Sequence, residues 1–440
     1  MKAELPRLCL FPQTAEVGNK GHLNIGGCDT AELAATFGTP LYVFDETALR
    51  NKCIEFRHEY GRRYPDTLVI YACKAFINPA LASILKEEGL GLDVVSAGEL
   101  GIARSIDFPS ESMFFHGNNK SREELREALE WGIGRIVVDN FLELQLLSEI
   151  AKEKNTSPNI LLRLSPGVDP HTHSYTTTGI LDSKFGFPII TGQAEEAVSR
   201  ATADPNLNLV GLHCHLGSPI FEMEPYQKAI EIMFRFAAEM KEKYDFELKE
   251  FSPGGGFAIQ YVLDSPAPST GDYAEAITSA VIEQSKVFKL IPPRLIVEPG
   301  RAIVGQAGVA LYRFGAAKEI PGIRKYVFVD GGMGDNIRPA LYGSEYEALV
   351  ANKAGEAEVE QVTIAGKFCE SGDKLIKDIS LPKIEEGDIL AMPDCGAYAL
   401  SMASNYNAFL KPAVVLVNEG KARLIRRRET CEDLVRCDLF

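Results

Sequence analysis

The chain has 440 residues, of which 45% are hydrophobic and 24% are charged, and its formal net charge at pH 7 is -15. This length favours two domains over one, and the composition is typical of a globular protein with a sizeable buried core. The negative charge, without any block of Lys and Arg, argues against nucleic acid or an anionic membrane as a partner and favours a small-molecule ligand.

The N-terminal stretch MKAELPRLCLFPQ lacks the apolar core of a secretory signal, and the chain has no apolar run of about 18 residues that would predict a membrane span. Nine cysteines are spread from Cys9 to Cys437 without a CxxC pair, which argues against a disulfide framework or a zinc site. We therefore expect a cytoplasmic protein whose cysteines are mostly reduced and buried.

Eight short runs rich in β-branched or aromatic residues predict strands between residues 68 and 300: LVIYACK (68–74), LDVVS (92–96), MFFHG (113–117), RIVVD (135–139), NILLRL (159–164), LVGLHCH (209–215), KEFSPGGG (249–256) and RLIVEPG (294–300). Helical patterns separate them, among others at 79–88, 121–131, 140–154 and 224–244. This alternation predicts an α/β fold with a closed, parallel (β/α)8 barrel of the TIM type. A doubly wound open sheet is the structural alternative.

After about residue 306 the pattern changes to strands joined by turns, at KYVFVDGG (325–332), VEQVTIAGKF (359–368), DILAMPD (388–394) and PAVVLVNEGKARLIRRRE (412–429). The last segment predicts a hairpin that turns at Asn418-Glu419-Gly420. The alternating piece GHLNIGG (21–27) predicts one more strand of this second domain. We expect a barrel domain over residues 39–306 and a second, mostly β domain, a β-barrel or sandwich, over residues 1–38 and 307–440.

Polar residues stand at or near the carboxyl ends of the predicted barrel strands: Lys74, Asp93, His116, Asp139, Arg163, His215, Gly254 and Glu298. Active sites of such barrels lie on that face. Any one of these residues could instead be a loop group that caps a helix or meets solvent. Their joint position favours a site.

Lys74 ends a buried run, where a lysine can be a phosphate ligand, a salt-bridge partner or a Schiff-base nucleophile. The glycine trio 254–256, Ser218 in HLGS and Arg301 in EPGR provide the groups that cradle a phosphate. Glu298 adds an acid. A lysine, a phosphate cradle and an acid for a pyridine nitrogen are together what pyridoxal phosphate requires.

Two histidine pairs, His171/His173 and His213/His215, have a spacing that puts both side chains on one face of a strand and is compatible with metal ligands. No cysteine or carboxylate cluster accompanies them at suitable spacing. We therefore expect no metal site and favour a ring-stacking role for His215.

These residues resemble those of the alanine-racemase-like barrel decarboxylases that use pyridoxal phosphate, and within them the diaminopimelate decarboxylases. The resemblance covers nearly the whole chain. It rests on GTPLYVFDE (38–46), YACKA, LDVVSAGEL, FHGNNKS, SKFGF, HCHLGS, GGG, EPGRAIVG, DNIRPALYG, CESGD, GAYALSMASNYN and ARLIRRRET.

The resemblance implies a role for each matching cofactor position. Lys74 would form the internal aldimine, His215 would lie against the face of the cofactor ring, and Glu298 would hold the pyridine nitrogen. The remaining cofactor positions are Ser218, Gly256, Gly300 and Arg301 on the phosphate side, with Asp93, Glu99 and Tyr398 nearby.

The resemblance also implies Cys369 in CESGD as the catalytic cysteine and Glu370 as a substrate-binding acid. In the family both reach the pocket from the partner subunit, which implies a homodimer with shared active sites. The further substrate contacts implied are Arg301, Arg338, Tyr342 and Tyr398. Two alternatives without a role in the site are that Cys369 is an inert small hydrophobic residue and that Arg338 pairs with Glu345 at the surface.

The reaction implied is decarboxylation of meso-2,6-diaminopimelate at its D centre to L-lysine and CO2, the last step of lysine biosynthesis, by a pyridoxal-phosphate-dependent carboxy-lyase. Cys369 or the displaced Lys74 would then protonate Cα. One alternative is a sister decarboxylase for D- or L-ornithine, lysine or carboxynorspermidine. The other is a catalytically silent binding protein of the same fold, against which the retention of Lys74, Cys369 and Glu298 argues.

Three positions depart from the family pattern. Phe76 stands where many relatives have Asn, Pro219 follows HLGS where Gln is common, and Lys367 precedes Cys369 by two residues where Gly-Pro-Leu-Cys is expected. None of these changes removes a reacting group, so they affect the expected fine geometry and not the chemistry.

Overall fold

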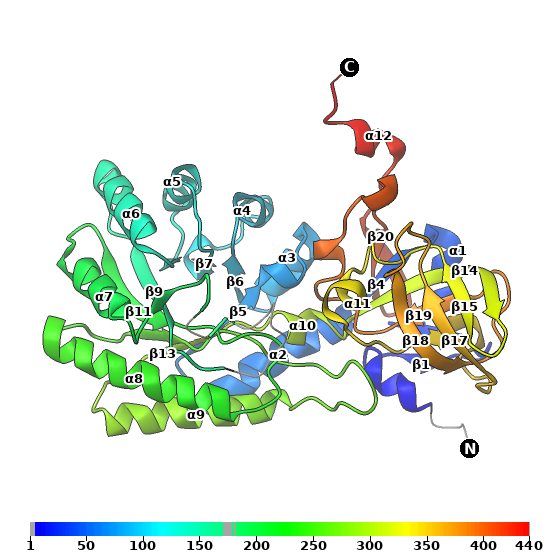
Figure 1. Ribbon diagram of the computed structural model, residues 1–440. Helices are drawn as coiled ribbons and strands as arrows, with labels where there is room; N and C mark the ends of the chain where they lie inside the picture. Colours follow the sequence, from blue (N-terminus) through cyan, green and yellow to red (C-terminus); the bar gives the residue numbers. More distant parts are fainter. Residues whose placement is uncertain (1–4, 170–177, 180–181, 440) are drawn as a thin grey trace. The chain divides into compact units, whose positions relative to one another are not determined.

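The computed structural model describes residues 5–169, 178–179 and 182–439 (Figure 1). It divides into two compact units. The barrel unit consists of Cys53–Ala258 and Ala267–Gly300, and the β unit consists of Met1–Lys52, Ile259–Pro266 and Arg301–Phe440. The domain boundaries expected from the sequence, at residues 39 and 306, stay a prediction.

Eight parallel strands close into a barrel in the order β5-β6-β7-β8-β9-β11-β12-β13, and β13 pairs back with β5. Their bounds are Thr67–Ala72, Gly91–Val94, Met113–Phe115, Arg135–Val138, Asn159–Ser165, Asn208–His213, Glu250–Ser252 and Arg294–Val297. The short strand β10 (Phe187–Pro188) also pairs with β9. Because the ring of strands is closed, the predicted (β/α)8 barrel is confirmed and the open sheet is excluded.

Helices surround the barrel strands in Figure 1. They are α2 (Glu46–Gly61), α3 (Pro79–Glu87), α4 (Ala97–Arg104), α5 (Arg122–Trp131), α6 (Phe141–Lys154), α7 (Gln193–Ala203), α8 (Glu224–Tyr244) and α9 (Thr270–Val287). Five of them begin at a polar side chain that accepts a backbone N–H of the first turn: Asn78, Ser96, Ser121, Asn140 and Ser269. Each such cap stabilises its helix by about 1 kcal/mol, so these helix starts are encoded locally.

The interior of the barrel is filled by apolar side chains from six strands. This cluster consists of Ile70, Phe114, Val137, Leu161, Val210 and Ile296, with the partly buried Leu68 packed against it. Burying one such side chain contributes roughly 1.5–3 kcal/mol. The barrel is therefore a packed core rather than a pore, and its polar groups are displaced toward the strand ends.

The β unit is built on one nine-stranded mixed sheet. Its strands are β4 (Leu41–Asp45), β14 (Gly308–Ile320), β15 (Arg324–Val329), β16 (Leu349–Val350), β17 (Glu360–Ala365), β18 (Lys374–Leu381), β19 (Ile389–Met392), β20 (Ala413–Asn418) and β21 (Lys421–Arg426). Short helices lie at α1 (Thr30–Phe37), α10 (Arg301–Val304), α11 (Arg338–Tyr342) and α12 (Cys431–Val435). The prediction of a second, mostly β part is confirmed.

Strand β4 has its neighbours far along the chain. It pairs antiparallel with β14 and parallel with β20. All five of its residues are buried, and Leu41 and Val43 belong to a core cluster that also contains Val309 and Val415. A segment that precedes the barrel in sequence is thus a central strand of the β unit.

The strand predicted at 21–27 exists and belongs to the β unit, as expected. It is β2 (Leu23–Ile25), and it pairs antiparallel with β1 (Glu16–Val17) and β3 (Cys28–Asp29). These three strands form a separate small sheet and do not extend the nine-stranded one. Leu23 and Ile25 are nevertheless fully buried in the core cluster of the β unit, which explains their alternation with polar residues.

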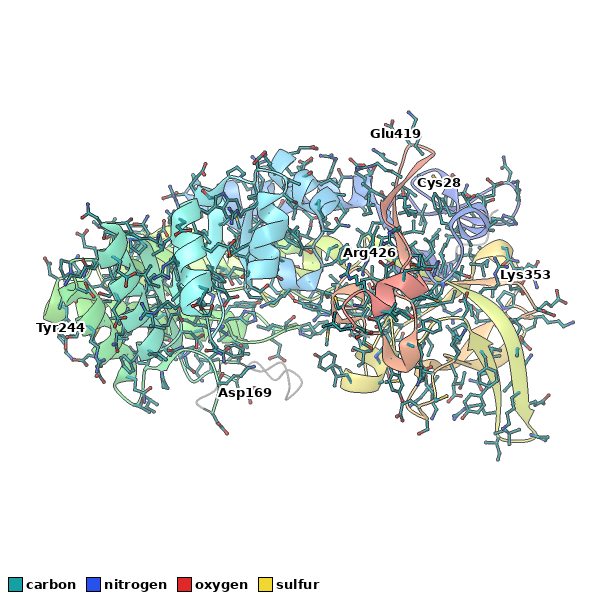
Figure 2. All side chains as sticks on the ribbon, turned by 90° about the horizontal axis from the view of Figure 1, so that it is seen from above. Cys28, Asp169, Tyr244, Lys353, Glu419 and Arg426 are labelled. Carbon is teal, nitrogen blue, oxygen red and sulfur yellow. The ribbon has the colours of Figure 1, made fainter. Side chains whose placement is uncertain are left out.

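The predicted C-terminal hairpin is confirmed. Asn418 pairs with Lys421, and the two residues between them, Glu419 and Gly420, have φ of +47° and +74°. Positive φ at both central residues matches the twist of a two-residue hairpin turn. Figure 2 shows Glu419 at the outer tip of this hairpin and Arg426 toward its base.

Among the described residues, no helix is long and apolar enough to cross a membrane. All nine cysteines are free thiols, and five of them are buried: Cys28, Cys53, Cys73, Cys214 and Cys395.

Candidate active site

Polar side chains gather at the carboxyl ends of the barrel strands, as predicted. Lys74 lies in a short 3-10 turn, Cys73–Ala75, that directly follows β5. The other strand-end side chains are Asp93 in β6, His116 after β7, Asp139 after β8, Arg163 in β9, His213 at the end of β11 and Glu298 after β13. Because the strands are parallel, one face of the barrel carries all of them.

Glu298 is a buried carboxylate held on several sides. Ser252 donates a hydrogen bond to its Oε1 (2.7 Å), and the Nε2 atoms of His213 and His116 lie 3.2 Å and 3.7 Å from the carboxylate. Burial raises the pKa of this carboxyl, but the two histidines and the hydrogen bonds more than offset burial and hold the pKa well below its usual range. Glu298 is therefore ionised at neutral pH and suited to a cationic partner.

Lys74 is exposed and interacts electrostatically with four neighbours: Asp93, Glu99, His116 and His215. Burial raises the pKa of Asp93, and the charge of Lys74 opposes that shift. Burial also raises the pKa of Glu99, which accepts a hydrogen bond from the Val95 N–H (2.7 Å). The ammonium group thus faces two carboxyl groups whose charge it stabilises.

His215 lies two residues beyond the end of β11, whereas the sequence predicted one strand through residue 215. Its Nδ1 accepts a hydrogen bond from the Gly255 N–H (3.2 Å), which puts the ring proton on Nε2. Burial, followed by the charge of Lys74, lowers the pKa of His215 well below its usual value. A neutral, oriented imidazole beside the lysine is compatible with the expected stacking role.

The glycine trio packs directly against the segment that carries Ser218. Gly256 has φ +102°, and a Cβ there would lie 2.4 Å from the Gly217 carbonyl oxygen. Gly254 has φ +81°, and its Cβ would lie 2.6 Å from His215 Nδ1. Side chains are excluded at both positions, so the backbone of this turn is open to a close approach by an anion.

A second group of predicted residues lies in the β unit. Arg301 begins α10, Arg338 begins α11, and both are buried, with 6% and 5% of their surface exposed. Arg301 lies over the ring of Tyr398 (4.8 Å to the centroid), and Tyr398 itself has φ +60°. Tyr342 ends α11. The alternative surface pair of Arg338 with Glu345 is absent, because no carboxylate of the described residues lies within 4.0 Å of the buried guanidinium.

Two tyrosines that the sequence analysis missed contact these arginines. Tyr261 receives a hydrogen bond from Arg301 Nη1 (2.7 Å), and Tyr346 receives one from Arg338 Nη1. Neither tyrosine belongs to a motif used above. The only sequence signal is that each lies within a few residues of one: Tyr261 after the glycine trio and Tyr346 after DNIRPALYG.

Cys369 and Glu370 are exposed residues of a loop in the β unit. The Cys369 N–H donates to Asn407 Oδ1 (2.9 Å), and the neighbouring Phe368 packs against Phe409 with ring centroids 4.9 Å apart. The departure at Lys367 puts an ammonium over the Phe409 ring, 4.8 Å from its centroid. The loop is therefore anchored while the thiol stays accessible, which argues against an inert buried cysteine.

Only one of the two histidine pairs considered as metal ligands can be described. His171 and His173 lie outside the described residues. His213 is the last residue of β11, and its Nε2 contacts Glu298, whereas His215 lies beyond the strand and accepts the Gly255 N–H. Instead, His116, His213 and Glu298 present ligand atoms within 4.8 Å of one another, a grouping that could hold a metal ion and that no sequence spacing indicated.

The barrel residues fit pyridoxal phosphate. An exposed lysine and an ionised acid follow the paired strands β5 and β13, and a glycine turn with excluded side chains lies on the same face. The backbone of Gly300 lies close to the turn that carries Lys74. A Cβ at Gly300 would be only 3.1 Å from the Ala72 carbonyl oxygen and from Ala75 Cβ. Among the described residues, buried Asp93 Oδ1 and His116 Nε2 have no hydrogen-bond partner, which is compatible with a polar ligand.

Comparison with known proteins agrees with this geometry. Residues 46–305 match the family model described as pyridoxal-dependent decarboxylase, pyridoxal binding domain. The diaminopimelate decarboxylase of Bacillus subtilis is 49% identical, with 97% of each chain covered.

Solved structures show the same likeness. The diaminopimelate decarboxylase of M. jannaschii, in complex with L-lysine, is 37% identical with a TM-score of 0.91 and 98% of each chain covered. The lysine/ornithine decarboxylase of Vibrio vulnificus, in complex with cadaverine, shares the fold at 23% identity and a TM-score of 0.76, with 89% of this chain and 98% of that chain covered.

Proposed function

This chain belongs to the diaminopimelate decarboxylases of the pyridoxal-dependent decarboxylase family, and we propose that the residues described above perform that reaction. It decarboxylates diaminopimelate to lysine, and pyridoxal phosphate is its cofactor. One observation carries the residue assignment: exposed Lys74 and ionised Glu298 end neighbouring strands and both interact with His116.

Each barrel residue has a proposed task in holding the cofactor. Lys74 would hold the group through its aldehyde carbon, His215 would lie against its ring, and Glu298 would keep its pyridine nitrogen protonated. The phosphate is held by the glycine turn at Gly256 with Ser218, Gly300 and Arg301, and Asp93, Glu99 and Tyr398 support the group. When bound, pyridoxal phosphate supplies the electron sink that accepts the electron pair left behind by CO2.

Residues of both units act on the substrate in this proposal. Arg338, assisted by Arg301, pairs with the distal carboxylate of the meso isomer, and Glu370 holds the distal ammonium. Tyr342 and Tyr398 complete the contacts. Cys369 or Lys74 would supply the proton that Cα at the D centre takes up after CO2 has left, so that L-lysine results.

The substrate assignment is tested by assay. We expect the purified protein to release lysine and CO2 from meso-diaminopimelate with a specificity constant at least about a hundredfold above that for lysine or ornithine, because a site built for the distal carboxylate loses that pairing when the group is missing. Stopped-time quantification of CO2 and amine products measures all three substrates. A preference for lysine or ornithine would favour the sister-decarboxylase alternative, and no turnover of any amino acid would favour the silent binding protein.

We further propose a homodimer with shared active sites. The supporting observation is that Cys369 and Glu370 are exposed on the β unit while their loop is anchored through Asn407 and Phe409. An accessible thiol on an ordered loop is suited to entering another subunit's site. The cytoplasmic location expected from the sequence stays a prediction.

Mixing two inactive variants tests the shared site. A Lys74→Ala chain and a Cys369→Ala chain, mixed at equal amounts, should regain about a quarter of wild-type activity, because half of the dimers are mixed and each of those has one intact site. Activity is followed as lysine release, and subunit exchange is verified with differently tagged chains. Absence of recovery despite exchange would mean that each chain completes its own site.

A further inference from the structure

Two buried arginines of the β unit share one tyrosine. Arg301 Nη1 donates a hydrogen bond to the Tyr261 hydroxyl (2.7 Å), and the guanidinium of Arg338 lies over the face of the same ring, 4.6 Å from its centroid. Tyr261 is therefore bound to one arginine through its hydroxyl and to the other through its ring. Tyr261 thus links the two guanidinium groups directly.

Tyr346 holds Arg338 from a second direction. Arg338 Nη1 donates a hydrogen bond to the Tyr346 hydroxyl, and the guanidinium lies 5.5 Å from the centroid of that ring. The rings of Tyr261 and Tyr346 meet edge-on, with centroids 5.3 Å apart and an interplanar angle of 83°. Tyr346 is only 3% exposed, so this arrangement is enclosed in the unit. Arg338 thus has a defined orientation before any substrate arrives.

These contacts hold the arginines without cancelling their charge. Burial raises the pKa of Tyr346 far above its usual value, so its hydroxyl is neutral at physiological pH. Asp394 is the carboxyl that interacts with Arg338, and burial raises its pKa well above the usual range as well. A carboxylate in place of either tyrosine would orient the guanidinium but also neutralise it, whereas hydroxyls and ring faces leave the charge available.

We propose that Tyr261 and Tyr346 are positioning residues that hold Arg301 and Arg338 in register for the carboxylate of an amino-acid ligand and so determine selectivity for ligands that carry this group. The inference rests on the proposed role of Arg338 in the decarboxylation of diaminopimelate. It assigns to the two tyrosines an effect on carboxylate recognition, in which Arg301 takes part in addition to its proposed contact with the cofactor phosphate.

Ligand affinity tests the proposal without relying on turnover. L-lysine retains the carboxylate distal to the reacting carbon, and cadaverine is the matching diamine without a carboxylate. The dissociation constants of both ligands are measured by isothermal titration into the holoenzyme. Tyr346→Phe should raise the dissociation constant of L-lysine about tenfold, and Tyr261→Leu should raise it by a similar factor, since each variant loses an interaction with a charged group. Tyr261→Phe keeps the ring and should raise the dissociation constant of L-lysine only about threefold. The cadaverine dissociation constant should stay within about twofold of wild type in all three variants.

Two comparisons separate positioning from general damage. In an Arg338→Ala background, Tyr346→Phe should weaken the binding of L-lysine no further, because the arginine that Tyr346 holds is gone. Tyr326→Phe is the matched control. Tyr326 also lies beneath an arginine of the β unit, with the guanidinium of Arg324 5.9 Å from its ring centroid, but it is outside the candidate site. Removal of its hydroxyl should change the dissociation constant of neither ligand.

The possible failures are distinguishable. Equal weakening of L-lysine and cadaverine by the tyrosine variants would overturn the inference in favour of a merely structural role. An effect of Arg338→Ala without any effect of the tyrosine variants would overturn this inference alone. Unchanged L-lysine affinity in Arg338→Ala would overturn the proposed role of Arg338 and the inference with it.

Discussion

Lys74→Ala is expected to lower kcat for lysine release from diaminopimelate by at least about ten-thousandfold. Lys74 is the group proposed to hold the cofactor's aldehyde carbon and to exchange with the substrate amine, and losses of this order follow removal of a residue that acts covalently. The turn Cys73–Ala75 holds this side chain in an exposed position, so its removal leaves no cavity in the packed core. The thermal unfolding midpoint should therefore change little while activity disappears.

Covalent labelling gives the same assignment a readout besides activity. The purified wild type should show a visible absorption band that disappears on borohydride treatment, after which mass spectrometry should find the cofactor on the peptide containing Lys74. Lys86→Ala is the matched control, since Lys86 is an exposed lysine of the next helix whose ammonium contacts the carbonyl oxygens of Ile106 and Asp107. It should retain wild-type activity within about twofold. Label on a different lysine would refute the assignment.

Arg338→Ala is expected to lower kcat/KM for diaminopimelate by at least about a hundredfold. Arg338 is 5% exposed and lacks a carboxylate partner within 4.0 Å among the described residues, and its proposed partner is the distal carboxylate of the substrate. Losing one partner of a desolvated charge pair costs roughly 3 kcal/mol or more, which corresponds to this factor. Steady-state kinetics with diaminopimelate measures the change.

The cofactor band should survive in this variant, because the proposed cofactor residues other than Arg301 and Tyr398 lie in the barrel unit and Arg338 is not among them. Arg324→Ala serves as the control: Arg324 forms an exposed pair with Asp378 and lies over Tyr326, and its loss should change kcat/KM by less than about twofold. Undiminished turnover of diaminopimelate by Arg338→Ala would show that the distal carboxylate is recognised elsewhere.

The barrel strands could be predicted because each is a short apolar run that ends in a polar residue. Parallel barrel strands are buried on both faces, so their sequences are apolar throughout, and the first polar residue marks the open end. Lys74 and Glu298 follow such runs directly and could be placed at one face of the barrel. The end of β11 was harder to predict, because the histidines at 213 and 215 continue the strand-like alternation beyond the last ladder residue.

The partners of Glu298 could not be predicted from spacing. His116 and His213 follow or end strands β7 and β11, and they meet the carboxylate only because the barrel closes and brings those strand ends around β13. The contacts of Tyr261 and Tyr346 are equally non-local, since both residues lie in segments between the predicted motifs. Sequence patterns report the environment of a single element, whereas these contacts depend on how several elements converge.

Strand pairing shows the same division. The alternation at 21–27 correctly indicated a strand with one buried face, but its partners are β1 and β3 rather than the large sheet. For β4, the buried run Leu41–Asp45 indicates a central strand without indicating which of the two units contains it. Side-chain burial is encoded along a strand, but the choice of neighbour is made by the rest of the sheet.

The position of β4 also has a consequence for biosynthesis. Its residues leave the ribosome early. The whole barrel sequence separates β4 from its neighbour β14, and most of the remaining chain lies between β14 and the other neighbour, β20. At roughly 5–20 residues per second, tens of seconds pass between the emergence of β4 and that of β20. By the end of this interval all eight barrel strands have emerged, while the apolar Leu41–Asp45 segment still lacks its neighbour β20. A nascent chain of this protein therefore exposes a strand that molecular chaperones would need to shield until translation is nearly complete.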